Sequence, residues 1–140
     1  DDATADRVDE LHSRFYKNEA DQLRLLPGAR EILEQLHDSG LRVVLATSAP
    51  ADELAILRRL LDSESVLYAV TSGEDVDTAK PDPTIVKIAL ERAGTESGRA
   101  VFVGDSVWDM RACQALGVPT VGVLSGGISR GELTEAGADH

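Results

Sequence analysis

The sequence predicts an α/β fold in which a parallel sheet carries helices on both faces. Short apolar runs typical of buried strands alternate with segments whose apolar residues recur at helical spacing. Because a helical segment separates each strand from the next, the connections are right-handed crossovers and the strands run parallel. With 140 residues, of which 42% are apolar, the chain is expected to form one domain with its own core.

The first half of the chain is predicted to contain three helices and one strand. Apolar residues at helical spacing indicate a helix over 7–17 and a second over 29–39. The run RVVLA at 42–46 is typical of a buried strand. A helix over 51–61 follows Pro50, whose fixed backbone angle suits a helix start.

The second half is predicted to contain three strands and two helices. The strands are expected at 66–72, 100–103 and 119–124, and the helices at 86–93 and 108–117. A polar loop, GEDVDTAKPDP, follows the first of these strands. Another, SGGISRG, follows the last strand, and no helix is predicted after it.

Two aspartates, Asp105 and Asp109, follow the strand at 100–103 in the sequence VFVGDSVWDM. Gly104 lets the backbone turn there, so that Asp105 lies at the strand end and Asp109 in the first turn of the next helix. Each acid alone is more often a helix cap than a functional group. The pair gains weight only if other polar groups converge on the same edge.

Polar groups do follow other strands. Thr47 and Ser48 come directly after the strand at 42–46, and Lys80 lies in the loop after the strand at 66–72. In a parallel sheet, ligands bind outside the carboxyl ends of the strands. Hydroxyl and backbone N–H donors bind anions, a lysine adds positive charge, and paired carboxylates suit a hard cation such as magnesium. Such groups together indicate phosphoryl transfer.

These motifs, in this order, resemble motifs two, three and four of the haloacid dehalogenase (HAD) superfamily of phosphohydrolases. The stretches LLPGAREILEQLHDSGLRVVLATSAP and SGEDVDTAKPDPTIVKIALERAG are similar to its phosphoglycolate phosphatase and beta-phosphoglucomutase-like branch. The resemblance covers nearly everything from Leu25 onward. It implies a Rossmann-like, HAD-like core over residues 23–140 and identifies residues 1–22 as the C-terminal part of a helical cap.

The resemblance also implies a role for each site residue. Thr47, with the Ser48 backbone N–H, would bind the transferring phosphoryl group, and Lys80 would bridge phosphate and nucleophile, so Thr47 and Lys80 are the expected catalytic residues. Asp105 would ligate Mg²⁺, and Asp109 would ligate it or orient a ligating water. The implied function is magnesium-dependent hydrolysis of a small phosphorylated metabolite through an aspartyl-phosphate.

The family's first motif, Asp-x-Asp followed by x-Thr or x-Val, is not found in the core region. In the family it carries the nucleophile and the general acid/base, and here it is expected N-terminal to residue 1. The 140 residues alone are therefore expected to be inactive, with a core that lacks its first strand and its C-terminal end. The tetrapeptide DVDT at 75–78 has the right acid spacing, but no apolar strand runs into it, so it is interpreted as a solvated loop.

The absence of that first strand predicts a second consequence. In the resembled fold it lies between the strand before Thr47 and the strand of Val103. Without it, we expect the chain to fold poorly, to pair these two strands directly, or to recruit a strand from another chain.

Two other functions remain open: a phosphomutase, and a non-catalytic domain of the same fold that binds phosphate or a partner protein. Twenty-five acids against 14 bases, a net charge of -11, argue against nucleic acid or an anionic membrane as a partner. No apolar stretch reaches the roughly 20 residues that span a bilayer. The single Cys113 fits a reducing compartment, so a cytoplasmic location is expected. The sequence predicts no oligomeric state.

Overall fold

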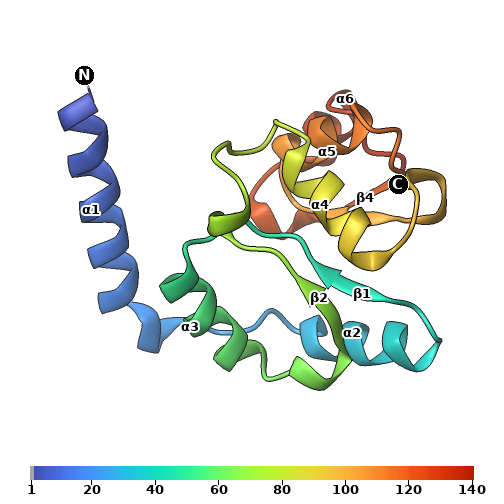
Figure 1. Cartoon of the computed structure of the whole chain (residues 1–140), viewed down its shortest axis with the longest axis horizontal. Coiled ribbons are helices and arrows are strands. Elements are labelled where there is room, and N and C mark those ends of the chain that lie inside the picture. Colours follow the sequence, from blue (N-terminus) through green and yellow to red (C-terminus); the bar gives the residue numbers. More distant parts are fainter. Residues whose placement is uncertain (1) are drawn as a thin grey trace.

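A computed structural model describes residues 2–140, with side chains described from residue 10 onward and at 4, 7 and 8. It shows an α/β fold built from short parallel strands and the helices that pack on them (Figure 1). The strands are β1 (Val43–Leu45), β2 (Leu67–Val70), β3 (Phe102–Gly104) and β4 (Thr120–Gly122). The α-helices are α1 (Asp2–Asn18), α2 (Ala29–Asp38), α3 (Ala51–Leu61), α4 (Thr84–Ala93), α5 (Val107–Gln114) and α6 (Arg130–Glu135). Single 3₁₀ turns are η1 (Ala20–Gln22), η2 (Glu64–Val66), η3 (Gly73–Asp75), η4 (Ser97–Arg99) and η5 (Leu124–Gly126).

The strands form two separate parallel pairs. β1 pairs with β2, with Val44 opposite Ala69, and β3 pairs with β4, with Phe102 opposite Thr120. The predicted parallel arrangement is confirmed. Within residues 2–140, however, β1 and β3 are not hydrogen-bonded to each other, so direct pairing, one of the three expected outcomes, does not occur. One edge of each of these two strands has no strand partner in the described part of the chain.

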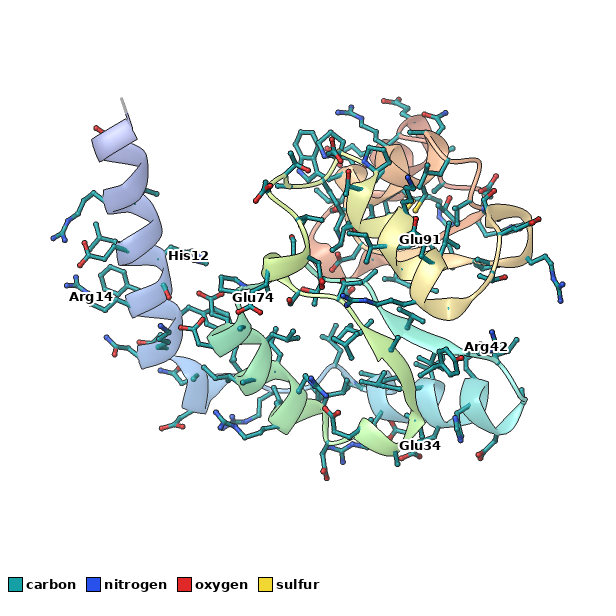
Figure 2. All side chains as sticks on the ribbon, in the orientation of Figure 1. His12, Arg14, Glu34, Arg42, Glu74 and Glu91 are labelled. Carbon is teal, nitrogen blue, oxygen red and sulfur yellow. The ribbon has the colours of Figure 1, made fainter. Side chains whose placement is uncertain are left out.

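Helix α4 packs against both strand pairs. Its residues Ile85 and Val86 are almost fully buried and pack with apolar side chains of α5 and of the segment that follows α5. The same helix contacts β1 and β2. Nη1 of Arg42, which lies at the amino end of β1 (Figure 2), donates a 2.6 Å hydrogen bond to the carbonyl of Ala93 at the end of α4. Gly94 then ends α4 in the left-handed conformation, which glycine adopts without strain.

Helix α6 is an element that the sequence interpretation missed. Its start is fixed by a capping box: Ser129 accepts a hydrogen bond from the Glu132 N–H, and the Glu132 carboxylate accepts one from the Ser129 N–H. Leu133, which is 2% exposed, then packs with Met110 of α5. The segment SGGISRG, residues 125–131, was predicted to be a loop throughout, but its last two residues already belong to α6, which begins at Arg130.

Helix α1 lies at one side of the molecule and contacts α3 (Figure 1). Lys17 forms an ion pair with Asp52, and burial together with the nearby Glu53 carboxylate raises the pKa of Tyr16. The helix predicted over 7–17 is confirmed, while its place in a cap stays a prediction. Within residues 2–140, neither α1 nor any other helix combines the length and apolar character needed to cross a membrane.

Candidate functional site

The loop after β1 carries Thr47 and Ser48, as the sequence predicted. The end of β2 holds this loop: the Thr47 N–H donates to Oγ1 of Thr71 at 2.9 Å, and the Gly73 N–H donates to the carbonyl of Ala49 at 2.8 Å. The Ala49 N–H in turn donates to Oγ1 of Thr47 at 3.1 Å. The Thr47 hydroxyl is thus used as an acceptor within the loop, and its own proton remains available to an incoming oxygen.

Asp109 lies in the first turn of α5, where it forms a capping box with Ser106. Its Oδ2 accepts hydrogen bonds from the Ser106 N–H at 3.1 Å and the Ser106 hydroxyl at 2.7 Å, while Oγ of Ser106 accepts the Asp109 N–H at 3.2 Å. The residue that caps the helix is therefore Ser106, not Asp105. Gly104 makes this arrangement possible, because a Cβ there would lie 2.7 Å from the Cβ of Asp109.

Lys80 reaches the other oxygen of Asp109. Its Nζ lies 2.6 Å from Oδ1, and the Lys80 and Asp109 side chains are 21% and 8% exposed. Burial by itself raises the pKa of Asp109, but the hydrogen bonds from Lys80 and Ser106 outweigh it, so the pKa lies below its ordinary value. Both oxygens of Asp109 are therefore engaged by groups of the protein, and the carboxylate is ionised at neutral pH.

Asp105 lies at the end of β3, with its side chain half-buried. Oγ of Ser125 donates to its Oδ2 at 3.3 Å. The turn η5 lies close against it, since a Cβ on Gly126 would come within 2.6 Å of the Asp105 carbonyl oxygen and 2.8 Å of its Oδ2. Gly126 thus lies directly against this carboxylate.

The structure unites some of the predicted site residues and leaves others apart. Lys80 and Asp109 are in direct contact. Within residues 2–140, no hydrogen bond or ion pair links Thr47 or Ser48 to Lys80, Asp105 or Asp109. That Thr47, Lys80 and Asp105 surround one phosphate-sized site stays a prediction.

Asp105 and Asp109 are the type of ligand that Mg²⁺ prefers, but two carboxylates are a small ligand set. Carboxylate oxygens are the hard ligands that Mg²⁺ prefers, yet no three His, Cys, Asp or Glu side chains gather as a metal site among the described residues. Mg²⁺ is commonly held by one or two carboxylates together with waters and substrate phosphate oxygens, so a small protein donor set fits it. Lys80 and Ser106 engage both oxygens of Asp109, whereas Ser125 engages one oxygen of Asp105, and that Asp105 ligates Mg²⁺ directly stays a prediction.

Two other candidates are structural. Asp75 of the DVDT sequence accepts a 2.7 Å hydrogen bond from the Ser72 N–H and pairs with Arg92, so it caps η3. Cys113 is fully buried, and burial followed by the nearby Asp109 charge raises the pKa of its thiol to about 12. It is a packing residue and not a nucleophile.

The sequence interpretation missed Thr71 and Ser125. Thr71 ends the apolar run VLYAVTS, and Ser125 opens the glycine-rich loop, so each stands beside a strand end. That position is the available signal, but which strand end each one faces depends on the pairing of β1 with β2 and of β3 with β4.

Comparison with known proteins matches this chain to a family. The family model for haloacid dehalogenase-like hydrolases matches residues 2–123. The phosphoglycolate phosphatase of Salmonella paratyphi A is 36% identical over 117 residues, which are 83% of this chain and 46% of that enzyme. The phosphoglycolate phosphatase of Escherichia coli K12 is 35% identical over 126 residues, which are 89% of this chain and 50% of that enzyme. The chain spans about half the length of these curated relatives.

Solved structures agree with the fold. A hydrolase from Pseudomonas syringae is 35% identical with a TM-score of 0.92, covering 99% of this chain and 66% of that one. A Thermotoga maritima protein whose name refers to beta-phosphoglucomutase is 31% identical with a TM-score of 0.80, covering 99% of this chain and 63% of that one. The α/β fold and the phosphoglycolate phosphatase and beta-phosphoglucomutase-like branch expected from the motifs are confirmed. The chain belongs to the haloacid dehalogenase-like hydrolase family.

Proposed function

We propose that the protein containing this chain is a phosphatase that hydrolyses the phosphate ester of a small metabolite. The observation that carries the proposal is the largely buried Lys80–Asp109 ion pair, whose Asp109 lies four residues after Asp105 at the end of β3. In this proposal Lys80 would supply a cation for phosphate and Asp105 a carboxylate for a metal, in a chain whose relatives are named phosphoglycolate phosphatases. A small phosphorylated acid of that kind is the proposed substrate class.

In the proposed reaction, an aspartate carboxylate attacks phosphorus, the ester P–O bond breaks, and the alcohol leaves with a proton. Water then cleaves the aspartyl-phosphate and releases inorganic phosphate. In the resembled family the attacking aspartate belongs to the first motif, which is not found in the core region of this chain, so these 140 residues are not proposed to turn over substrate alone.

The residues of this chain bind and orient the phosphoryl group. The Thr47 hydroxyl proton and the Ser48 N–H would donate to its oxygens, and the Lys80 ammonium would offset the charge that develops on them. Asp109 would hold Lys80 in place through the 2.6 Å contact. Asp105 would hold Mg²⁺, which when bound neutralises phosphate charge.

A phosphomutase is the second candidate, because the Thermotoga maritima structure is 31% identical over nearly the whole chain. A mutase would pass the phosphoryl group from the aspartate to another sugar hydroxyl instead of to water. A non-catalytic phosphate-binding or protein-binding domain is the third. A cytoplasmic location is part of the proposal, since a phosphorylated metabolite is an intracellular substrate.

The test is a substrate panel assayed on the complete gene product. Release of inorganic phosphate with Mg²⁺ would be measured for 2-phosphoglycolate, sugar phosphates and nucleotides, with Asp105→Asn as the inactive control. Phosphate release that Asp105→Asn abolishes supports the phosphatase. Conversion of one sugar phosphate into its isomer without phosphate release would support the mutase, and no turnover of any compound would contradict both.

A further inference from the structure

Thr71 lies directly after β2 and is fully shielded from solvent. Its Oγ1 accepts the Thr47 N–H at 2.9 Å and donates to the Thr47 carbonyl at 2.8 Å. A hydroxyl has one proton, and the Thr47 oxygen is nearer than the Leu45 carbonyl at 3.5 Å. The Thr71 N–H donates separately to Leu45 at 2.9 Å. The buried Thr71 side chain therefore forms hydrogen bonds with both the N–H and the carbonyl of Thr47.

These two hydrogen bonds determine which hydrogen-bond donors of the loop are left to bind an anion. The Thr47 N–H is taken by Thr71, and the Thr47 Oγ1 already accepts the Ala49 N–H. Within residues 2–140, neither the Thr47 hydroxyl proton nor the Ser48 N–H donates to another protein atom. Fixing the Thr47 backbone thus leaves these two donors for an incoming oxygen.

The same segment braces the rest of the loop. The Gly73 N–H donates to the Ala49 carbonyl at 2.8 Å, and a Cβ on Gly73 would lie 2.9 Å from the Ser48 carbonyl oxygen. Residues 71–73 therefore contact the loop at three successive residues, Thr47, Ser48 and Ala49. Thr71 supplies the only side-chain hydroxyl in these contacts among the described residues.

We propose that Thr71 is a positioning residue for the phosphoryl site, acting through Thr47. It holds the Thr47 backbone so that the Thr47 hydroxyl and the Ser48 N–H face the transferring phosphoryl group. The inference rests on the proposed function, because Thr47 is the residue that touches the phosphate. Donors fixed before the reaction stabilise developing charge without reorganising, so loss of the Thr71 hydrogen bonds lowers kcat more than it raises KM.

A buried threonine can also serve packing alone, and two variants separate these roles. Thr71→Val keeps the side-chain shape but loses the hydroxyl, whereas Thr71→Ser keeps the hydroxyl but loses the methyl group. If the hydroxyl positions Thr47, valine impairs the enzyme and serine rescues it. If packing is the whole role, the order reverses. Thr71→Ala is a second hydroxyl-free variant, and circular dichroism checks that each variant is folded.

The experiment measures kcat and KM of the complete gene product with p-nitrophenyl phosphate and Mg²⁺. We expect Thr71→Val to lower kcat by about 10- to 100-fold, and Thr71→Ser to keep most of the wild-type kcat. In a Thr47→Ala background, Thr71→Val should cost much less, because the residue through which it acts is gone. Amide hydrogen exchange adds a readout independent of activity: the Thr47 N–H should exchange faster in Thr71→Val but not in Thr71→Ser.

The outcomes separate the two ideas. An active wild type with a fully active Thr71→Val, or equal losses from Thr71→Val in both backgrounds, overturns the role of Thr71 and leaves the phosphatase proposal standing. A wild type that hydrolyses no phosphate ester overturns the proposed function and, with it, the role of Thr71, even where the exchange data confirm the hydrogen bond.

Discussion

The ammonium of Lys80 lies 2.6 Å from Oδ1 of Asp109, although the two residues are far apart in the sequence and both side chains are largely buried. The contact ties the loop before α4 to the first turn of α5. Ser106 holds the opposite oxygen of the same carboxylate, so the pair has one well-defined geometry. A buried pair of this kind is costly to break from one side, because the remaining charge has no partner.

Replacing Lys80 by methionine should therefore destabilise the protein as well as inactivate it. The Asp109 carboxylate, 8% exposed, would lose its cation, and we expect a loss of about 3 kcal/mol in the free energy of unfolding. Urea unfolding at pH 7 measures it. The matched control is Lys80→Met with Asp109→Asn, which removes both charges and should be less destabilised than the sum of the single variants. Additive losses would show that the pair is not coupled.

The same pair makes stability depend on pH. Folding lowers the pKa of Asp109 below the value of an unfolded Asp, which is about 3.9. As the pH falls, the unfolded chain therefore takes up this proton before the folded chain does. The contribution is present above that value and is lost as the pH falls through the lower folded pKa. Unfolding free energies between pH 3 and 6 should fall more steeply toward acid for wild type than for Asp109→Asn. Parallel curves would contradict this.

Gly104 should tolerate no side chain. A Cβ there would lie 2.7 to 2.9 Å from three atoms of Asp109, so Gly104→Ala should shift this carboxylate and cost about 1–3 kcal/mol of stability. Gly98→Ala is the matched control, because a Cβ at Gly98 meets nothing within 4 Å. Thermal unfolding of the two variants compares them, and equal melting temperatures would mean that Asp109 moves aside freely.

The Cys113 thiol should be unreactive in the folded protein. It is fully buried and its pKa is raised to about 12, so almost no thiolate exists at pH 8. Iodoacetamide should label Cys113 only after unfolding in urea, as read by mass spectrometry. Rapid labelling of the native protein would show that the α4–α5 core opens readily.

Local signals in the sequence predicted the elements well where they are strong. The bounds of α3 agree with the helix expected over 51–61, because Pro50 marks its start and the apolar spacing its length. The turn at Gly94 and the place of Asp105 at a strand end also follow from local chemistry. Helix α6 was predictable as well, since Ser129 and Glu132 have the spacing of a capping box.

Contacts between distant segments could not be predicted in this way. That Thr71 would face Thr47 depends on the register of β2 against β1, which includes an irregularity between Val43 and Val44. Lys80 forms its ion pair with Asp109 and not with Asp105 because of the way α4 packs against α5. Such pairings arise from tertiary packing, about which residue type and spacing carry little information.

We propose that Thr47, Lys80 and Asp105 converge on one phosphate group. The most direct measurement is a crystal structure of the complete gene product with Mg²⁺ and tungstate, a heavy analogue of phosphate. We expect one tungstate that accepts hydrogen bonds from the Thr47 hydroxyl, the Ser48 N–H and the Lys80 ammonium, with a metal ion bound to Asp105. A tungstate bound elsewhere, or Thr47 and Asp105 too far apart to reach the same anion, would contradict it.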